Sequence, residues 1–421
     1  MILLDILKYA NICIGALFIL CYSYQVFYLL IGTVVKPKKF APAEQNNRFA
    51  FVISARNEEG VIGQLCDSIR AQSYPSHLID IFVVADNCTD NTADVAREKG
   101  AFVYERFNKE QIGKGYALEF LFEKIKEQVG FDYYDGFFVV DSDNLLDKNY
   151  VSEMNNCMAA GNKLAMCYRN SKNYGDNWIS AGYSLWFLRA SRHLNNPRQY
   201  FNTSAEITGT GFLVHKDIIK RDGGWVTHCL IEDIEFTIQN VMKGEKVAFC
   251  NDAIAYDEQP TKFMQSFHQR KRWTKGYVYI LKTYGIKLFK KFFRGEGFSN
   301  FDMIMAVSPA FFITSFAVLF NVVMLILIPI VDITLASAAL MTAVIGVVAS
   351  YVLFFFVGLL SAVCEWDRIH VSTGRKIWSL FTFPVFMMTY IPITFAAIFT
   401  KAEWREIKHH AAKDNFAGEE K

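Results

Sequence analysis

The sequence predicts an α/β domain attached to helices that cross or border a membrane. Short β-branched or aromatic runs alternate with a helical stretch, as strands and helices do in an α/β layer. Four long uncharged apolar runs flank this region. With 52% hydrophobic residues among 421, the chain is too long for one compact domain and too apolar for an ordinary soluble protein. We therefore expect a soluble part and a membrane part.

The first apolar run, residues 10–35, is long enough to cross a bilayer, since about 20 apolar residues span the hydrocarbon core. The alternative is a cleaved signal peptide. The length of the run, the offset of Lys8 by Asp5, and the lack of a small-residue cleavage site argue against it. Three lysines follow within residues 36–39, so the positive-inside rule places the next segment in the cytoplasm.

Three more apolar runs occupy residues 303–331, 335–363 and 377–400. The loop around Asp332 carries no Lys or Arg, whereas residues 366–376 carry three of them. Under the positive-inside rule, the first two runs therefore form a hairpin that points away from the cytoplasm.

The last run is harder to place. A full crossing would put Lys401, Arg405 and Lys408 on the outside, against the positive-inside rule. Pro384 and Pro392 interrupt the run, and a broken or re-entrant segment would return the tail to the cytoplasm. Both topologies stay open.

The soluble region contains three expected buried strands, at residues 49–54, 79–85 and 136–140. A helical stretch at 59–72 separates the first two, which implies parallel pairing. In parallel sheets, ligands bind beyond the carboxyl ends of the strands. The polar residues that this topology places there are Asn57, Glu58, Asp86, Asn87, Asp141 and Asp143.

The sharpest local pattern is Asp141-Ser142-Asp143, directly after a buried strand. In an extended backbone alternate side chains share a face, so the two carboxylates would point the same way. Such oxygen ligands suit Mg²⁺, which often takes one or two protein carboxylates plus substrate phosphates. An acidic turn that caps the next helix is the structural alternative.

A helical pattern begins at residues 231–232 and ends at Gly244, with Glu232 and Asp233 in its first turn. Stabilisation by the helix dipole is the ordinary explanation for carboxylates there. Residues 263–293 then interleave aromatic and basic side chains, which is typical of a segment that lies in the headgroup plane.

Composition and missing motifs exclude several functions. A net charge of only +2 gives no reason to expect a nucleic-acid partner. Nine cysteines without C-x-x-C spacing argue against a zinc site or a disulfide framework, and favour a reducing compartment. Residues 113–115 lack the rest of a P-loop, and residues 208–211 lack the third glycine of a dinucleotide fingerprint. The commonest hydrolase motifs are also missing from the sequence.

Five segments occur in a familiar order: Ser54-Ala55-Arg56-Asn57-Glu58-Glu59, Ala85-Asp86-Asn87-Cys88-Thr89-Asp90, Asp141-Ser142-Asp143, Ile231-Glu232-Asp233 and Gln269-Arg270-Lys271-Arg272-Trp273. This set resembles the motifs of glycosyltransferase family 2. More narrowly, the chain resembles the membrane-embedded, processive branch that includes cellulose, hyaluronan and poly-N-acetylglucosamine synthases.

The resemblance implies an α/β domain of GT-A type, which is Rossmann-like, with flanking transmembrane and amphipathic interface helices. The implied parts are an N-terminal transmembrane helix (1–40), a cytosolic glycosyltransferase domain (41–262), interface helices that carry Q-x-x-R-W (263–300), C-terminal transmembrane segments (301–400) and a polar tail (401–421).

The resemblance also implies roles for individual residues. The nucleotide-binding residues would be Arg56, Glu58, Asp86, Lys114 and Asp141. The ligands of a Mg²⁺ or Mn²⁺ cofactor at the diphosphate would be Asp143 and Asp141. The catalytic residues would be Asp233 as general base, with Glu232, Gln269, Arg272 and Trp273. Two departures from the family pattern, Ile231 for the usual Thr and Asn87-Cys88 for the usual Gly-Ser, affect fine contacts but retain the acids.

The expected activity is an inverting transfer of a hexose or N-acetylhexosamine from a nucleotide diphosphate sugar, a UDP-sugar above all, to a growing polysaccharide, with translocation of the chain as a further option. Q-x-x-R-W favours this acceptor. A glycolipid-forming enzyme and a non-catalytic partner subunit are the alternatives. The expected partners are the donor, the acceptor, membrane lipids and an accessory subunit, and the expected location is the cell membrane, multi-pass, with the catalytic domain in the cytoplasm.

Overall fold

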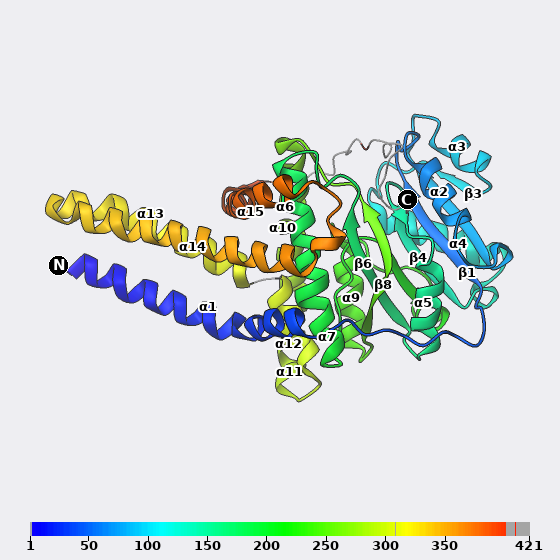
Figure 1. Ribbon diagram of the computed structural model, residues 1–421, viewed down its shortest axis with the longest axis horizontal. Helices are drawn as coiled ribbons and strands as arrows, with labels where there is room; N and C mark the ends of the chain where they lie inside the picture. Colours follow the sequence, from blue (N-terminus) through cyan, green and yellow to red (C-terminus); the bar gives the residue numbers. More distant parts are fainter. Residues whose placement is uncertain (1, 308, 401–408, 410–421) are drawn as a thin grey trace.

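The computed structural model describes residues 2–307, 309–400 and 409. A sheet domain lies at one end of an elongated molecule, and three long helices extend from it side by side (Figure 1). The domain combines one mixed sheet with helices along the chain, so the α/β prediction is confirmed.

The sheet has eight strands in the order β3-β2-β1-β4-β7-β6-β8-β5. Their bounds are β1 Phe49–Ala55, β2 Ile79–Asp86, β3 Phe102–Arg106, β4 Gly136–Asp141, β5 Leu145–Leu146, β6 Leu164–Ser171, β7 Phe212–His215 and β8 Val247–Asp257. As predicted, β1 pairs in parallel with β2, and it also pairs in parallel with β4. The strand β7 runs antiparallel to both β4 and β6.

Helices cover the sheet because its central strands are apolar on both faces. In β1 six of the seven residues are buried, as expected for a strand enclosed on both sides. The helix α4 packs on β1 and β2, and α5 packs on β6 and β8. The helices of this layer are α2 Ile62–Arg70, α3 Thr92–Glu98, α4 Lys114–Gln128, α5 Tyr150–Ala159, α8 Lys216–Asp222 and α9 Glu232–Met242. The helix expected at 59–72 is therefore shorter than predicted.

A second group of helices lies between the sheet and the three long helices (Figure 1). It comprises α6 Trp178–Ala190, α7 Asn196–Tyr200, α10 Phe263–Ile280, α11 Ile286–Phe293 and α12 Phe298–Val307. Short helical segments complete the chain: η1 Ser76–Leu78, η2 Phe131–Tyr133, η3 Ser191–Asn195, η4 Leu281–Gly285, η5 Ile333–Leu335 and η6 Trp366–Arg368.

The long helices are α1 Ile2–Val34, α13 Pro309–Val331 and α14 Ala336–Cys364. Four helical stretches are long and apolar enough to cross a membrane: Ile2–Val34, Phe312–Val331, Ile333–Cys364 and Thr373–Phe399. They coincide with the four predicted runs, although the run at 303–331 is divided between α12 and α13.

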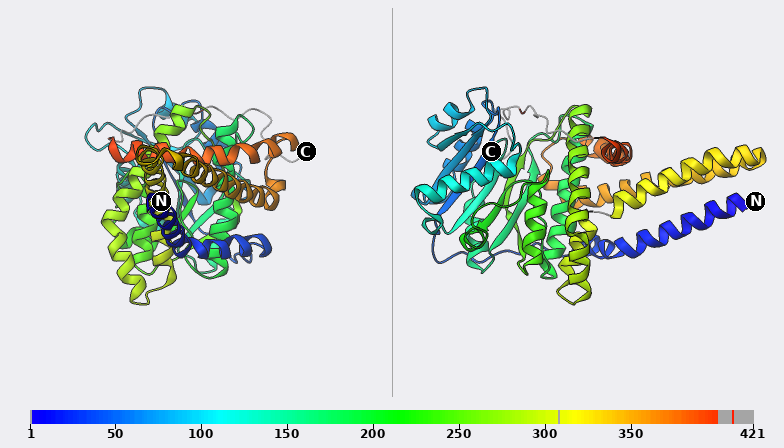
Figure 2. Two further views of the ribbon diagram at one scale, coloured as in Figure 1. Left: turned by 90° about the vertical axis from the view of Figure 1, so that its left-hand side faces the viewer. Right: turned by 180° about the vertical axis from the view of Figure 1, so that it is seen from behind.

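The last of these stretches differs in direction from the others. It consists of α15 Thr373–Met388 and α16 Tyr390–Phe399, which lie across the bases of α13 and α14 (Figure 2). The helix α15 packs on α6, and α16 packs on α10. The break falls at Thr389 and not at either proline. Lys401, Arg405, Lys408 and the rest of the 401–421 tail except His409 lie outside the described residues.

A buried polar cluster ties the long helix α1 to the sheet domain. Arg198 on α7 donates from Nε and Nη2 to the two carboxylate oxygens of Asp302 on α12, at 2.8 Å each. Tyr24 and Tyr28 of α1 donate to the same carboxylate, at 3.0 and 3.1 Å. Because Arg198 and Asp302 are at most 1% exposed, this cluster fixes the base of α1 firmly.

Candidate active site

One cavity of about 1270 Å³ begins at the carboxyl edge of the sheet and continues between the long helices. Every residue to which the family resemblance assigned a role lines it. These residues are Arg56, Glu58, Asp86, Lys114, Asp141, Asp143, Glu232, Asp233, Gln269, Arg272 and Trp273. Asp86, Asp143 and Asp233, which are far apart in the chain, are therefore gathered in one space.

Two residues expected at this edge shape the loops and are not among the cavity's lining residues. Asn57 and Asn87 have φ angles of 56° and 53°, a left-handed conformation that asparagine tolerates better than most residues. Asn57 accepts a hydrogen bond from the Thr89 backbone at 2.8 Å, and Asn87 accepts one from the Asn108 backbone at 2.9 Å. Both amides therefore join neighbouring loops.

Asp86 ends β2 and is buried against Arg106, a residue that no sequence motif indicated. Arg106 donates from Nη1 to Asp86 Oδ1 at 2.6 Å, and it also donates to the Gln111 carbonyl at 2.9 Å. Asp86 and Arg106 occupy paired positions on β2 and β3. Only the register of this parallel pair, which no local motif records, could have predicted the contact.

Lys114 connects the strand edge with α9. It begins α4, donates to Asp141 Oδ1 and to the Gly209 carbonyl, and lies 3.8 Å from Glu232 Oε1. One ammonium group thus compensates two carboxylates, one at the end of β4 and one at the start of α9.

The two aspartates of the D-x-D pattern reach the cavity in a different way from the one predicted. The strand β4 ends at Asp141, and the Asn144 backbone donates to the Asp141 carbonyl at 3.1 Å, which closes a turn. A turn, and not an extended segment, therefore presents Asp143. Side-chain hydrogen bonds of Asn144 stabilise this turn.

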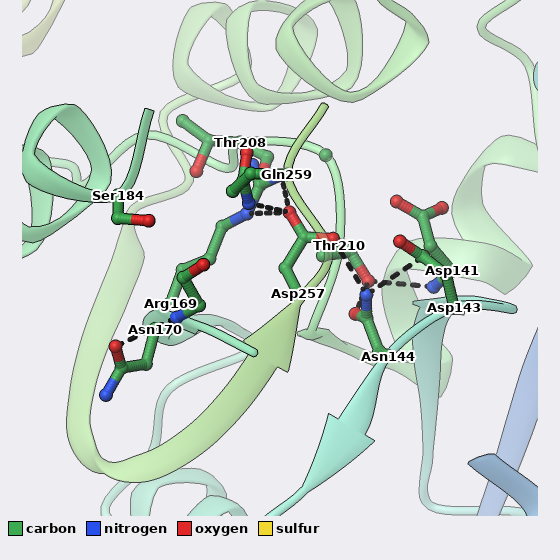
Figure 3. A network of polar contacts seen from close by, with 12 residues as sticks. Asp141, Asp143, Asn144, Arg169, Asn170, Ser184, Thr208, Thr210, Asp257 and Gln259 are labelled. Carbon is green, nitrogen blue, oxygen red and sulfur yellow. Dashed lines mark hydrogen bonds and ion pairs between the residues drawn. The ribbon is translucent and has the colours of Figure 1, made fainter. Parts of the chain in front are cut away.

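A buried network supports this turn (Figure 3). Asn144 donates from Nδ2 to both Asp143 and Asp257, at 3.2 Å each, and accepts from Thr210 at 2.6 Å. Arg169 binds Asp257 from the neighbouring strand, with an Nε to Oδ2 distance of 2.8 Å. Burial alone would raise the pKa of Asp257, but Arg169 lowers it below its usual range. Asp257 therefore stays ionised and orients Asn144.

Asp143 has no arginine or lysine partner of this kind within the described ranges, and its nearest cationic group is the His409 imidazole, with 3.8 Å between Nε2 and Oδ2. Burial raises the pKa of Asp143 to about 7; the charge of His409 opposes this increase, and the nearby Asp257 and Asp141 add to it. A carboxylate in this state gains from a cation.

His409 is the most unexpected member of the site. Its Nδ1 lies 2.8 Å from Glu58 Oε1, and its Nε2 lies 3.8 Å from Asp143 Oδ2. Although burial lowers the pKa of His409, Asp143 and Glu58 together raise it to about 10. The contact places His409, which follows α16 in the chain, at the edge of the sheet domain. No sequence spacing could have predicted it.

On α9, Glu232 and Asp233 occupy the first turn, as predicted. Asp233 accepts a hydrogen bond from the Gly209 backbone. Burial raises the pKa of Glu232 to about 7, and burial also raises the pKa of Asp233 above its usual value. A carboxylate with a raised pKa is a stronger proton acceptor.

The helix α10 contributes three residues to the wall of the cavity: Gln269, Arg272 and Trp273. Trp273 packs edge to face against Tyr183 and Phe187, at 5.8 and 6.4 Å between ring centroids. The Gln269 Oε1 atom is buried and has no hydrogen-bond partner among the residues that the structure describes. A buried acceptor of this kind is costly unless a ligand donates to it.

The far part of the cavity has a different character. Long helices α1, α13 and α14 wall it, and aliphatic side chains predominate. Examples from these three helices are Ile14, Val26, Val318, Leu325, Ile345 and Leu353. A polar pocket at the sheet edge thus continues into an apolar pocket among the membrane-type helices.

The fold and the site define a class of protein: a GT-A type, Rossmann-like domain with acids at its carboxyl edge, joined to helices able to span a membrane. Residues 46–276 match the family described as "Glycosyltransferase like family 2". The chain belongs to this family.

Known relatives agree with this assignment. The chain is 28% identical over 264 residues to "Probable glycosyltransferase YdaM" of Bacillus subtilis, covering 58% of each chain. It is 24% identical over 273 residues to "Beta-monoglucosyldiacylglycerol synthase" of Nostoc sp., covering 62% of this chain and 56% of the relative. The alignments thus span little more than half of the relatives' lengths.

A solved structure has a similar fold over nearly the whole chain. It is the mannosyltransferase PcManGT from Pyrobaculum calidifontis, in complex with GDP-Man and Mn²⁺. The TM-score is 0.57 at 15% identity, and the match covers 92% of this chain and 98% of the other. At this identity the likeness supports the fold, including the arrangement of the helices outside the sheet domain.

Proposed function

We propose that the protein transfers a sugar from a nucleotide diphosphate sugar to a lipid acceptor. The observation that carries the proposal is the single cavity, which joins the carboxylates at the sheet edge to an aliphatic pocket between α1, α13 and α14. Acyl or polyprenyl chains match such walls, because apolar surface is stable there and not in water. The relative named as a monoglucosyldiacylglycerol synthase supports the same acceptor class.

The donor occupies the polar end of the cavity in this proposal. Asp86 and Asp141 hold the nucleoside, with Arg56, Glu58 and Lys114 nearby, as the family resemblance implies. The donor is a UDP-sugar, although a neighbour in the solved structures was captured with GDP-Man.

The residues at the diphosphate position fit a divalent cation. Carboxylate oxygens from Asp143 and Asp141 are donor types that Mg²⁺ and Mn²⁺ accept. Within the described ranges, no three His, Cys, Asp or Glu side chains form a complete metal site, so substrate oxygens would fill the remaining positions. A bound cation would neutralise charge on the leaving diphosphate.

Asp233 acts as the general base. The acceptor oxygen attacks the anomeric carbon and gives its proton to the Asp233 carboxylate, while the bond from that carbon to the diphosphate oxygen breaks and its electron pair leaves with the diphosphate. The sugar carbon is thereby inverted. Arg272 stabilises the negative charge of the leaving group, and Gln269 and Trp273 hold the acceptor end. Glu232 keeps Lys114 in place beside Asp233.

A growing polysaccharide is the second candidate acceptor. The observation in its favour is that Gln269, Arg272 and Trp273, the Q-x-x-R-W residues typical of processive enzymes, line the cavity together. Aliphatic side chains predominate in the walls beyond them and favour the lipid, although Phe18, Tyr22 and Asn321 also line that part of the cavity. A non-catalytic subunit has the least support, since all the acids share one cavity.

The proposed location is the cell membrane, with the sheet domain (41–262) in the cytoplasm and 1–40 and 301–400 as membrane segments. Two features support this arrangement. Lys36, Lys38 and Lys39 follow shortly after α1, and the sheet domain lies at one end of all three long helices (Figure 1). Residues 263–300 would then lie at the interface. Membrane lipids, and an accessory subunit, are the proposed partners besides the substrates.

The test is to incubate the purified protein in lipid nanodiscs with radiolabelled UDP-glucose, UDP-N-acetylglucosamine or GDP-mannose, in the presence of native membrane lipids. Label that enters the organic phase, and that is abolished by EDTA, supports the proposal. Label only in high-molecular-weight material would replace it with the polysaccharide function. Absence of turnover with every donor would favour the non-catalytic alternative.

A further inference from the structure

Arg189 lines the cavity at the end of α6, where the polar pocket meets the long helices. It donates from Nη2 to Gln25 Oε1 on α1 at 3.1 Å, and its guanidinium lies 4.8 Å from the centre of the Trp186 ring. Gln25 also lines the cavity, and it lies on α1 between the two tyrosines that bind Asp302. The position of this pair is therefore fixed.

The charge of Arg189 is not compensated in the part of the chain that the structure describes. None of the carboxylates there lies within 4.0 Å of it. Two other arginines of the same cavity differ in this respect, because Arg198 binds Asp302 and Arg169 binds Asp257. Burial lowers the pKa of Arg189 to about 10, and the positive charge of Arg198 contributes to the decrease.

A half-buried guanidinium that faces a cavity without a counter-anion is unfavourable unless a ligand supplies the anion. The planar fork of arginine suits phosphate oxygens, which it can bind in pairs. The diphosphate of the donor has another proposed partner, because Arg272 lines the cavity from α10 and acts electrostatically on Glu232 of α9. The anion at Arg189 is therefore expected to belong to the acceptor.

We propose that Arg189, oriented by Gln25, binds a phosphate in the head group of the lipid acceptor. This inference rests on the proposed function and specifies its substrate class: a lipid that carries a phosphate, as distinct from a neutral diacylglycerol. The acyl or polyprenyl part lies among the aliphatic side chains of α1, α13 and α14, and the phosphate lies at the boundary beside α6.

The test compares dioleoylphosphatidic acid with dioleoylglycerol, two probes that differ only in the phosphate. Binding to the full-length protein is measured by native mass spectrometry, for wild type, Arg189→Gln and Arg189→Lys. We expect the wild type to prefer phosphatidic acid by about tenfold or more, which is the usual strength of a hydrogen bond to a charged group. Arg189→Gln should lose this preference, and Arg189→Lys should keep part of it.

The matched control is Arg192→Gln, one turn further along the chain. Arg192 lies 3.5 Å from Glu365, and it does not contribute to the cavity lining. This variant should keep the preference, which excludes a general effect of surface charge. A midpoint of thermal unfolding within a few degrees of wild type shows that Arg189→Gln is folded.

Equal binding of the two lipids by the wild type, or an unchanged preference in Arg189→Gln, would overturn the inference. Inorganic phosphate that binds as tightly as phosphatidic acid would show that free phosphate is the ligand, and would overturn the lipid assignment. Failure of the proposed function is distinguished by the radiolabel assay: label in a polymer refutes the lipid acceptor, whereas label in neutral lipids alone refutes only the phosphate site.

Discussion

Asp233→Asn separates proton transfer from the other contributions to the reaction. Asp233 accepts a hydrogen bond from the Gly209 backbone, and it is 8% exposed in the cavity. Asparagine has nearly the same volume, and its Oδ1 atom can accept the same hydrogen bond. The substitution therefore removes the proton acceptor and leaves the fold of the α9 start intact.

The expected loss follows from the role of the group. General base catalysis contributes about 10²- to 10⁴-fold, which corresponds to a barrier increase of about 3 to 5 kcal/mol. The loss should fall on kcat. The affinity for the nucleotide should change less than threefold, roughly 0.6 kcal/mol, because the proposed nucleoside ligands Asp86 and Asp141 lie on β2 and β4.

The assay is label transfer to lipid under saturating donor, combined with calorimetric titration of UDP. Glu235→Gln is the matched control. Glu235 lies on the same helix and is also buried, but it accepts hydrogen bonds from the backbones of His228 and Cys229 at 3.2 and 3.1 Å and is not among the lining residues of the cavity. It should retain most activity. Transfer at the wild-type rate by Asp233→Asn would refute the assignment of the base.

Three further predictions follow from the same structure. Asp143→Asn should abolish the stimulation of donor binding by Mn²⁺, and titration of the nucleotide with and without the metal checks this. Burial raises the pKa of Glu232 from its ordinary value of 4.5 to about 7, so its ionisation opposes folding above pH 7 and not below pH 4.5. Glu232→Gln should therefore stabilise the protein by about 3 kcal/mol at pH 8, and the gain over wild type should vanish as the pH falls from 7 to 4.5 in thermal unfolding. Asp302→Ala leaves Arg198 buried without its partner, and should lower stability by about 3 to 5 kcal/mol in the same measurement.

The central part of the fold could be predicted from local sequence. The strands β1, β2 and β4 lie within one residue of their predicted ends, because each is a continuous apolar run that polar residues terminate. The predicted end of the helical pattern near Gly244 also agrees with α9, Glu232–Met242. In these segments the local pattern and the burial in the folded chain agree.

The remaining strands depend on distant contacts. The strand β7 has only four residues, and β8 pairs in parallel with β6 although more than 70 residues separate them. Packing between segments determines this pairing, and no local period in the sequence encodes it. The break of the last apolar run at Thr389 likewise separates two helices with distant partners, since α15 packs on α6 and α16 packs on α10.

The site also combines residues that local sequence could predict with residues that only distant contacts bring together. Its acids follow strand ends, which is why they could be proposed from sequence and why they share a cavity. Their partners could not be proposed: Arg106 reaches Asp86 across a strand pair, Asn144 connects Asp143 with Asp257, and His409 arrives from beyond the last helix. These contacts depend on register and chain reversal, for which single residues carry no spacing rule.

The cavity joins a polar part to an aliphatic part, and the two substrates proposed for it explain why both parts are needed. A charged sugar nucleotide is excluded from aliphatic walls, because charge is costly in an apolar environment. Removing one 16-carbon acyl chain from a bilayer into water costs about 13 kcal/mol at about 0.8 kcal/mol per CH₂. Neither substrate can therefore travel to the other, and they must meet at a boundary. The Asp302 cluster holds α1 against α7 and α12, and thereby keeps the aliphatic walls beside Asp233, where the acceptor oxygen and the donor carbon would come together.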